Sequence, residues 1–372
     1  MFFDDCQWIH FQSLLLSLLL TPFKPTLCEM TKVLGFGTHR SKHNAFIINS
    51  SDIILKARHY YALIILFLLK KAGEPIYFIF DDTTNKKTGK HIDGAFKYFS
   101  HLSKTYVKGQ QIVCSIISYR GLIIPYGFDI PKEQCLKFGI TFRKKTQIAL
   151  EQLKSFEANS NQTVYVLADT YYATEPIMNY CRLKKQHLTS LKFNGVFRVN
   201  GHQTNVRNYL KHTIKGFKSS RKIKPGKINY RVENRKAELK TGGVVKLVFT
   251  KHPTHRTTMV LVTTGTALSA YEIMPAYPIR LNIEVFFKIS KQYLGLNGYQ
   301  SRNIGAIKSR IALSMFSYNL LTHAFINDMC AKAKSLTKKN ISTFSITEML
   351  AELRFQINVD NFEQHNILMK CQ

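Results

Sequence analysis

Acidic residues are scarce in this chain of 372 residues: 23 Asp and Glu stand against 53 Lys and Arg, for a formal net charge of +30. Hydrophobic residues still make up 45% of the sequence, which excludes a disordered polycation and allows a large core with two or three domains. Such an excess of positive charge on a folded chain favours a polyanionic partner, most often nucleic acid. Charge alone leaves open the alternative of a basic protein without that specialisation.

Cysteine is used sparingly and without a pattern. The seven cysteines are scattered, and none forms a CxxC pair or a cluster with histidine, which excludes a zinc site of the usual spacing. The histidines also lack metal-binding spacing. We therefore expect no zinc and predict buried, unpaired thiols in a reducing cytoplasm.

Long hydrophobic runs are absent as well. The run Phe11–Leu20 is like the core of a signal peptide, but acidic residues precede it and no small-residue cleavage site follows. The run Tyr60–Lys71 is too short to cross a bilayer. Both runs predict buried helices, so we expect neither a leader nor a membrane partner.

Two short apolar stretches predict buried strands that end in acids. The stretch Pro75–Phe80 is followed by Asp81 and Asp82, and the stretch Thr163–Ala168 is followed by Asp169. Binding sites in α/β sheets gather at the strand ends. The aspartates are therefore candidates for one site.

The sequence between and after these strands predicts further elements. Residues 110–128 read as two strands joined by a tight turn at Tyr119-Arg120-Gly121, and residues 143–157 have the spacing of a helix. A second helix is predicted at 173–185. Strands that alternate with helices indicate an α/β fold with a mixed sheet covered by helices.

Residues 201–260 are strongly basic, with 15 Lys and Arg against two Glu. Segments such as VVKLVFT and TMVLVTT predict strands, so we expect an inserted, strand-rich basic module at 195–265. The basic residues are densest at 215–231, and a mobile, solvated surface loop is the alternative interpretation of the module. The functional interpretation is a surface that grips phosphates. On this interpretation the DNA-binding candidates are Lys218, Arg221, Lys222 and Lys224.

A single carboxylate, Glu284, lies in the basic and aromatic stretch 277–292. If Pro278 is the first helical residue, one helix face carries Tyr277, Arg280, Glu284, Lys288 and Lys291. The opposite face carries Ile279, Ile283 and Phe286 and is predicted to meet the core. A solvated row of salt bridges is the simpler interpretation. The alternative is a carboxylate that binds Mg²⁺ among cations that hold phosphates.

The spacing Tyr277-(2)-Arg280-(3)-Glu284-(6)-Lys291 resembles the Y-R-E-K signature of DDE transposases of bacterial insertion sequences. The segment YFIFDDTT is similar to the strand that carries the first aspartate of that family, and VYVLADTYYAT to the one that carries the second. The order Asp, Asp, Glu and a strand-rich insertion before the Glu also agree. The resemblance covers residues 30–325.

This resemblance implies a ribonuclease-H-like mixed sheet flanked by helices and an oligomeric complex on DNA. It also implies two Mg²⁺ ions, for which Mn²⁺ can substitute, and cut-and-paste transposition. The implied catalytic residues and metal ligands are Asp82, Asp169 and Glu284. Strand alternation lets only one of Asp81 and Asp82 face the site. Asp82 is preferred because it directly precedes Thr83, as in the family pattern.

The family also suggests partners and a setting. Tyr277, Arg280 and Lys291 would contact phosphates near the cleaved end, and Lys288 extends their row. We expect double-stranded DNA, both transposon ends and target, as the partner of a homodimer in the bacterial cytoplasm, associated with the nucleoid. The only tryptophan, Trp8, leaves Tyr or Phe to stack on any base flipped near the core.

We expect five regions along the chain. They are a helical N-terminal DNA-binding region (1–72), a first part of the catalytic core (73–194), the basic insertion (195–265), a helical second part of the core (266–330) and a C-terminal tail (331–372). Two other functions stay open. One is a ribonuclease-H-like nuclease that cuts structured DNA without joining ends, and the other is an inactive, DNA-binding remnant of a transposase.

Overall fold

The structure is a computed structural model of the chain. It describes residues 2–22, 25–33, 39–69, 74–89, 91–100, 104–131, 142–158, 161–191, 195–214, 217, 221–224, 228–254, 258–333 and 345–355.

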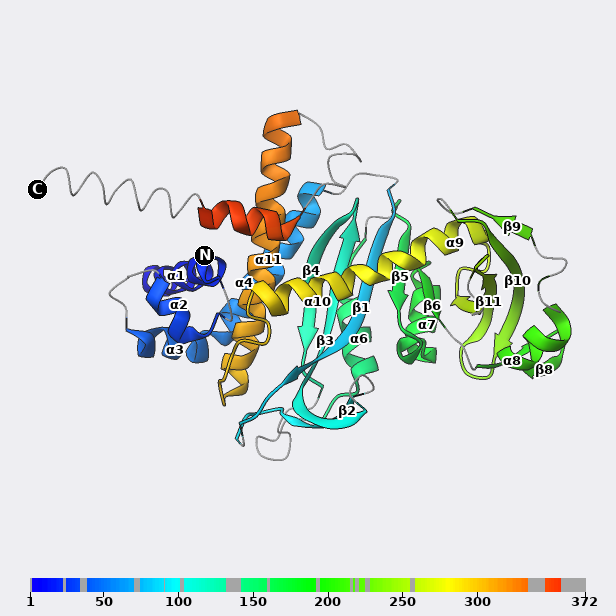
Figure 1. Ribbon diagram of the computed structural model, residues 1–372, viewed down its shortest axis with the longest axis horizontal. Helices are drawn as coiled ribbons and strands as arrows, with labels where there is room; N and C mark the ends of the chain where they lie inside the picture. Colours follow the sequence, from blue (N-terminus) through cyan, green and yellow to red (C-terminus); the bar gives the residue numbers. More distant parts are fainter. Residues whose placement is uncertain are drawn as a thin grey trace, which may run out of the picture.

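The chain begins with helices, as the sequence predicts. They are α1 (Asp5–Leu20), α2 (Leu27–Val33), α3 (Arg40–Asn49) and α4 (Ser51–Leu69). Asp4 starts α1 by accepting a hydrogen bond from the backbone N–H of Gln7, whose side chain bonds back to the backbone of Asp4. These helices pack against the long helix α11 (Ile304–Ala333), which stands beside α4 in Figure 1. None of the helices in the described ranges is long and apolar enough to cross a membrane.

Strand β1 (Ile76–Lys86) lies between two neighbours in the sheet. It pairs antiparallel with β3 (Thr105–Tyr119) and parallel with β5 (Val164–Ala168). The expectation that this strand ends before the aspartates is wrong, because the pairing with β3 continues through Asp81 and Asp82 as far as Lys86. A long antiparallel partner therefore keeps this polar half of β1 extended.

The predicted turn at Tyr119-Arg120-Gly121 is confirmed. It joins β3 to β4 (Leu122–Asp129), and both Arg120 and Gly121 have positive φ, 51° and 85°. Positive φ at both positions is the conformation of a type I′ turn, one of the two turn types whose twist matches that of the flanking strands.

One continuous mixed sheet contains twelve strands of the described chain, in the order β2-β3-β1-β5-β6-β12-β11-β10-β7-β8, with β4 on β3 and β9 on β10. The remaining strands are β2 (Phe96–Ser100), β6 (His187–Leu191), β7 (Val196–Val199), β8 (His202–Asn205), β9 (Arg221–Ile223), β10 (Tyr230–Leu239), β11 (Gly243–Lys251) and β12 (Thr258–Thr263). The strand-rich character expected for the basic segment is thus present. Because β12 pairs with β6, these strands extend the same sheet. The short helices α8 (Val206–Tyr209) and η2 (Leu210–Ile214) follow β8.

Helices cover both faces of the sheet, which confirms the expected α/β class. Helices α6 (Lys145–Lys154) and α7 (Glu175–Leu183) pack with Phe78 and Phe80 on one face. Helices α10 (Asn282–Tyr293) and α11 pack with Ile79 and Cys114 on the other. Figure 1 shows α10 crossing the sheet in front of β1.

The sequence pattern from Leu268 to Tyr293 predicts one long helical region around Glu284, and the structure confirms it, although Pro278 is not its first residue. Helix α9 (Ala270–Ala276) starts at a capping box between Ser269 and Glu272 and continues through the tight helical turn η4 (Tyr277–Leu281) into α10. Ile283 and Phe286 are buried and Ile279 is partly buried, so the predicted apolar face is confirmed.

The cysteines are only partly as expected. Cys114 and Cys181 are buried free thiols, but Cys6 and Cys28 are exposed. The prediction of buried thiols is wrong for those two. Cys6 lies in the first turn of α1 and Cys28 in the first turn of α2, and neither side chain is covered.

A buried lysine ties the end of β1 to the loop after α10. The Lys87 amine donates hydrogen bonds to the carbonyl oxygens of Tyr299 (2.6 Å) and Asn297 (3.1 Å), and it lies 3.5 Å from the centre of the Tyr299 ring. Burial, helped by the charge of Arg310, lowers the pKa of Lys87 from its usual 10.5 to about 7.

This pKa predicts how stability depends on pH. Between pH 7 and 10.5 the unfolded chain holds a proton on Lys87 that the folded chain has released. The free energy of unfolding should therefore rise with pH in this window, by at most about 1.4 kcal/mol per pH unit. Urea unfolding across the window should show this rise in the wild type and in the exposed control Lys86→Met. In Lys87→Met the rise should be missing, and an equal slope in all three proteins would contradict the assignment.

Candidate active site

An arginine lies between two carboxylates where β1 meets the start of α10. The Arg280 guanidinium donates to Asp81 Oδ2 at 2.7 Å and to Glu284 Oε1 at 3.0 Å. The side chains of Arg280 and Asp81 are only 14% and 17% exposed, whereas Glu284 is 55% exposed. One cation thus connects an acid of the sheet with an acid of the helix, and Glu284 keeps an open side toward solvent.

The third acid, Asp169, directly follows β5. Its Oδ1 accepts a hydrogen bond of 2.6 Å from the backbone N–H of Thr170 and starts the short helix η1 (Thr170–Tyr172). The last pair in the parallel β1–β5 ladder is Phe80 with Ala168. Asp81 and Asp169 are therefore the residues that directly follow the last pair of this ladder, Asp81 within β1 and Asp169 just after the end of β5.

The electrostatics show that these groups sense one another. Burial raises the pKa of Asp81 to about 6. The charge of Arg280 and the hydrogen bond from the backbone N–H of Asp82 oppose this rise, whereas the negative charges of Asp82 and Asp169 add to it. Burial also raises the pKa of Tyr277. The charge of Arg280 opposes this rise, and the charges of Asp81, Asp169 and Glu284 add to it. The cluster thus holds more negative charge than Arg280 balances, and Tyr277 stays a neutral hydroxyl beside it.

Asp82, which the sequence favoured over Asp81, lies on the other face of the sheet. Its Oδ1 accepts hydrogen bonds from Lys145 Nζ and from the hydroxyl of Tyr172, both at 2.9 Å. Consecutive residues of a strand point to opposite faces, so only Asp81 can turn toward Arg280. Sequence reasoning noted the alternation but had no means to tell which face α10 covers.

The two lysines of the polar helix face have different surroundings. Lys291 donates to the hydroxyl of Thr83 (2.6 Å) and to the carbonyl oxygen of Thr84 (3.1 Å), and burial lowers its pKa. Lys288 is exposed. Lys291 is thus engaged with β1, whereas Lys288 is open to a ligand. The bond to Thr83 is a contact that sequence reasoning missed, since no local signal pairs the two residues.

The basic candidates of the inserted segment are exposed where they are described. Arg221, Lys222 and Lys224 lie on and just after β9, while Lys218 lies outside the described residues. Lys222 stands opposite Arg231 in the β9–β10 ladder. Two like charges at directly opposed positions repel unless an anion neutralises them.

The donor chemistry of Asp81, Asp169 and Glu284 suits a hard divalent ion. Carboxylate oxygens are the ligands that Mg²⁺ prefers. Within the described ranges, no three Asp, Glu, His or Cys side chains are already gathered closely enough to hold an ion. Between Asp81 and Glu284 the positive charge is supplied by Arg280.

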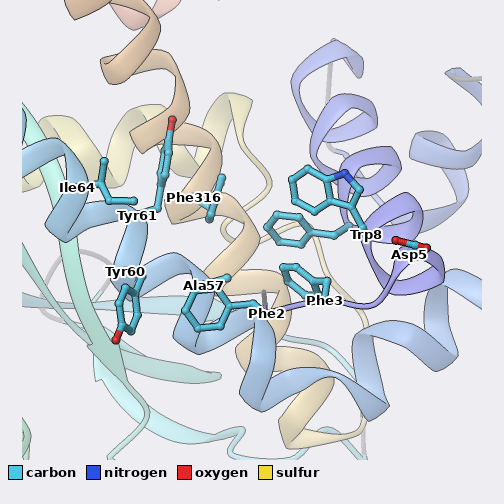
Figure 2. Close-up of a pocket in the computed structure, with 10 residues that line it drawn as sticks. Phe2, Phe3, Asp5, Trp8, Ala57, Tyr60, Tyr61, Ile64 and Phe316 are labelled. Carbon is cyan, nitrogen blue, oxygen red and sulfur yellow. The ribbon is translucent and has the colours of Figure 1, made fainter.

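A separate aromatic cavity of 310 Å³ lies among α1, α4 and α11 (Figure 2). Trp8, Phe2, Tyr60 and Phe316 are among its lining residues, and none of the three acids of the site is. The single tryptophan thus belongs to the N-terminal helices. Tyrosines lie nearer the acids: Tyr172 bonds to Asp82, and Tyr277 senses the charges of Asp81, Asp169 and Glu284.

Comparison with known proteins gives two matches. The sequence profile of the DDE superfamily endonucleases matches residues 6–237. A probable transposase for insertion sequence element IS701 from Microchaete diplosiphon is 25% identical over 311 residues, which are 77% of this chain and 75% of that protein.

The different surroundings of the two lysines predict different effects of substitution. Lys291→Met removes the two hydrogen bonds to β1 and should lower the free energy of unfolding by about 1–3 kcal/mol. Lys288→Met removes an exposed charge of the same helix and should change it by less than about 0.5 kcal/mol. Urea unfolding of both variants measures the difference. Equal effects would show that Lys291 does not brace the strand.

Proposed function

The chain belongs to the DDE superfamily endonucleases, and we propose that it works as the transposase of an insertion sequence. This membership confirms the family resemblance seen in the sequence, and the mixed sheet flanked by helices accords with a ribonuclease-H-like fold. In the proposed reaction the protein cuts double-stranded DNA at the ends of its element and joins those ends to target DNA. The meeting of Asp81, Glu284 and Arg280 beside Asp169 is the observation that carries the proposal.

We assign Asp81, in place of Asp82, as the first catalytic carboxylate, with Asp169 and Glu284 as the second and third. Their oxygens would hold divalent ions, Mg²⁺ by preference. Such ions would supply activation of the attacking oxygen and stabilisation of the leaving one. Asp81 and Asp169 are held by the sheet, and Glu284 by the helix that crosses it. The protein therefore presents the three carboxylates from separate rigid elements, as precise positioning of a reacting phosphate requires.

Arg280 is assigned to bind a phosphate of the DNA end. In the free chain its guanidinium neutralises Asp81 and Glu284. Its buried Nε has no hydrogen-bond partner in the described part of the protein. The planar fork of an arginine suits a phosphate as well as a carboxylate. The neutral hydroxyl of Tyr277 would donate a second hydrogen bond, Lys288 would add charge, and Lys291 would hold α10 on β1.

The basic strands are assigned to the DNA backbone. A phosphate chain along β9 and β10 would neutralise the opposed Lys222 and Arg231, which otherwise repel. We propose that residues 1–72 and 195–265 bind DNA and that 73–194 and 266–330 form the catalytic core, followed by a tail at 331–372. The protein would act as a homodimer on DNA, in the cytoplasm at the nucleoid.

The catalytic assignment predicts a loss of cleavage without a loss of binding. Asp81→Asn, Asp169→Asn and Glu284→Gln each keep the side-chain shape but remove the charge that a metal ion requires. Each should lower Mg²⁺-dependent cleavage of DNA that carries the element's ends by more than about 10³-fold, in line with the loss of a catalytic group. Glu272→Gln, an exposed acid of the preceding helix, serves as the control and should cut normally.

The products of the same assay separate the competing functions. A wild type that cuts and joins ends supports a transposase. A protein that cuts without joining ends would be a nuclease of the same fold. A protein that binds the DNA but does not cut it would be an inactive remnant of a transposase. If Glu284→Gln cleaves at the wild-type rate, Glu284 is not catalytic and serves only in a surface salt bridge.

The assignment of the basic strands predicts a change in salt dependence. The triple variant Arg221→Gln, Lys222→Gln, Lys224→Gln should bind DNA more weakly and lower the slope of log affinity against log salt by up to about 3. A control that removes three exposed lysines elsewhere, Lys154, Lys184 and Lys185, should keep the wild-type slope. Equal losses in both variants would mean that only net charge matters.

A further inference from the structure

Asp82 is hydrogen-bonded to one residue of the turn that begins at Asp169 and to the first residue of α6. Its carboxylate accepts hydrogen bonds from Tyr172 and Lys145. Tyr172 is 1% exposed and packs edge-on against Phe80, with 5.1 Å between ring centres. Burial and the charge of Asp82 raise the pKa of the Tyr172 hydroxyl far above its usual range, so it stays protonated and keeps donating.

Tyr172 is the last residue of η1, the turn that Asp169 begins. The backbone N–H of Tyr172 donates to the carbonyl oxygen of Asp169 at 3.0 Å, so the phenol and the acid are parts of one rigid turn. Lys145 holds the same turn from outside, because its amine lies 4.4 Å from the centre of the Tyr171 ring. A hydrogen bond from Tyr172 to β1 thus fixes the position of Asp169 relative to that strand.

The backbone alone does not provide this link. Pairing between β1 and β5 ends at Phe80 and Ala168, one residue before Asp81 and Asp169. Beyond that point the two acids repel, since the charge of Asp169 disfavours ionisation of Asp81. The bond from Tyr172 to Asp82 connects the turn after β5 to β1 immediately after the β1–β5 ladder stops, on the opposite face of the sheet.

We infer that Asp82 is a positioning residue that holds Asp169 at a fixed separation from Asp81 through the hydroxyl of Tyr172. This inference rests on the proposed function, in which Asp81 and Asp169 share a divalent ion. In such sites the groups that orient the ligands commonly change metal affinity by 10–100-fold when they are removed. Asp82 would thus act on the metal site without touching it.

Tyr172→Phe is the sharpest test because it removes one hydroxyl and keeps the ring against Phe80. We would measure Mn²⁺ affinity by electron paramagnetic resonance, using the full chain bound to DNA that carries the element's ends. The half-saturating Mg²⁺ concentration for cleavage would be measured in parallel. Tyr172→Phe and Asp82→Asn should each weaken Mn²⁺ binding about 10-fold, and the double variant no more than either alone. Tyr171→Phe loses a hydroxyl from the neighbouring residue and should bind Mn²⁺ normally.

The outcomes separate this inference from the function on which it rests. Asp81→Asn should abolish Mn²⁺ binding; if Tyr172→Phe then binds like the wild type, the positioning role is refuted and the proposed function stands. Loss of binding in Asp82→Asn but not in Asp81→Asn would make Asp82 a ligand and also overturn the inference. If the wild type itself binds no Mn²⁺, both proposals fall. If Tyr172→Phe has a lower Tm but an unchanged affinity for Mn²⁺, the hydrogen bond between Tyr172 and Asp82 has a purely structural role.

Discussion

The ion pair between Asp81 and Arg280 is the contact on which the geometry of the site depends. It joins strand β1, paired on both sides, to the helical segment that carries Glu284. Both side chains are largely buried, and a buried charge that loses its partner is strongly destabilised. Each therefore requires the other while no further charge is present. Because Arg280 also contacts Glu284, one guanidinium sets the relation between acids that lie far apart in the sequence.

From this ion pair toward the end of β1, one face of the strand contacts the helical segment with Arg280 and α10, and then the loop after α10. Asp81 binds Arg280, Thr83 binds Lys291, and the side-chain amide of Asn85 donates to the carbonyl oxygen of Leu296. These are alternate residues of a strand, so they share a face. A slip of β1 by one residue would turn all of them to the wrong side at once. The register that β3 and β5 impose on β1 thus positions the acids more firmly than any single side chain does.

The features that could be predicted from sequence are those whose signals are local. The hairpin turn at Arg120-Gly121, the strand before Asp169 and the buried face with Ile283 and Phe286 each follow from a short pattern. The length of β1 could not be predicted, because its second half is polar and stays extended only by pairing with β3.

The directions in which Asp81 and Asp82 point could not be predicted from the sequence, for a related reason. Phe78 and Phe80 on one face and Ile79 on the other are all buried. Alternating hydrophobicity, the usual guide to the inner face of a strand, is therefore absent from β1. Only the placement of α10 decides that Asp81 meets Arg280 and that Asp82 meets Tyr172. For Lys291 the sequence suggested a DNA contact, whereas its bond to Thr83 depends on a strand from a distant part of the chain.

The continuity of the sheet has a mechanical consequence. Backbone hydrogen bonds run without a break from β1 through β5, β6, β12 and β11 to β10, so the strand with Asp81 and the strands with the basic side chains form one stiff plate. The N-terminal helices lie at one end of this plate and β9 and β10 at the other (Figure 1). A hinge between the acids and the basic strands would have to break a ladder. A duplex that contacts both must therefore adapt its own curvature to the protein, and easily bent sequences would be favoured without any contact to their bases.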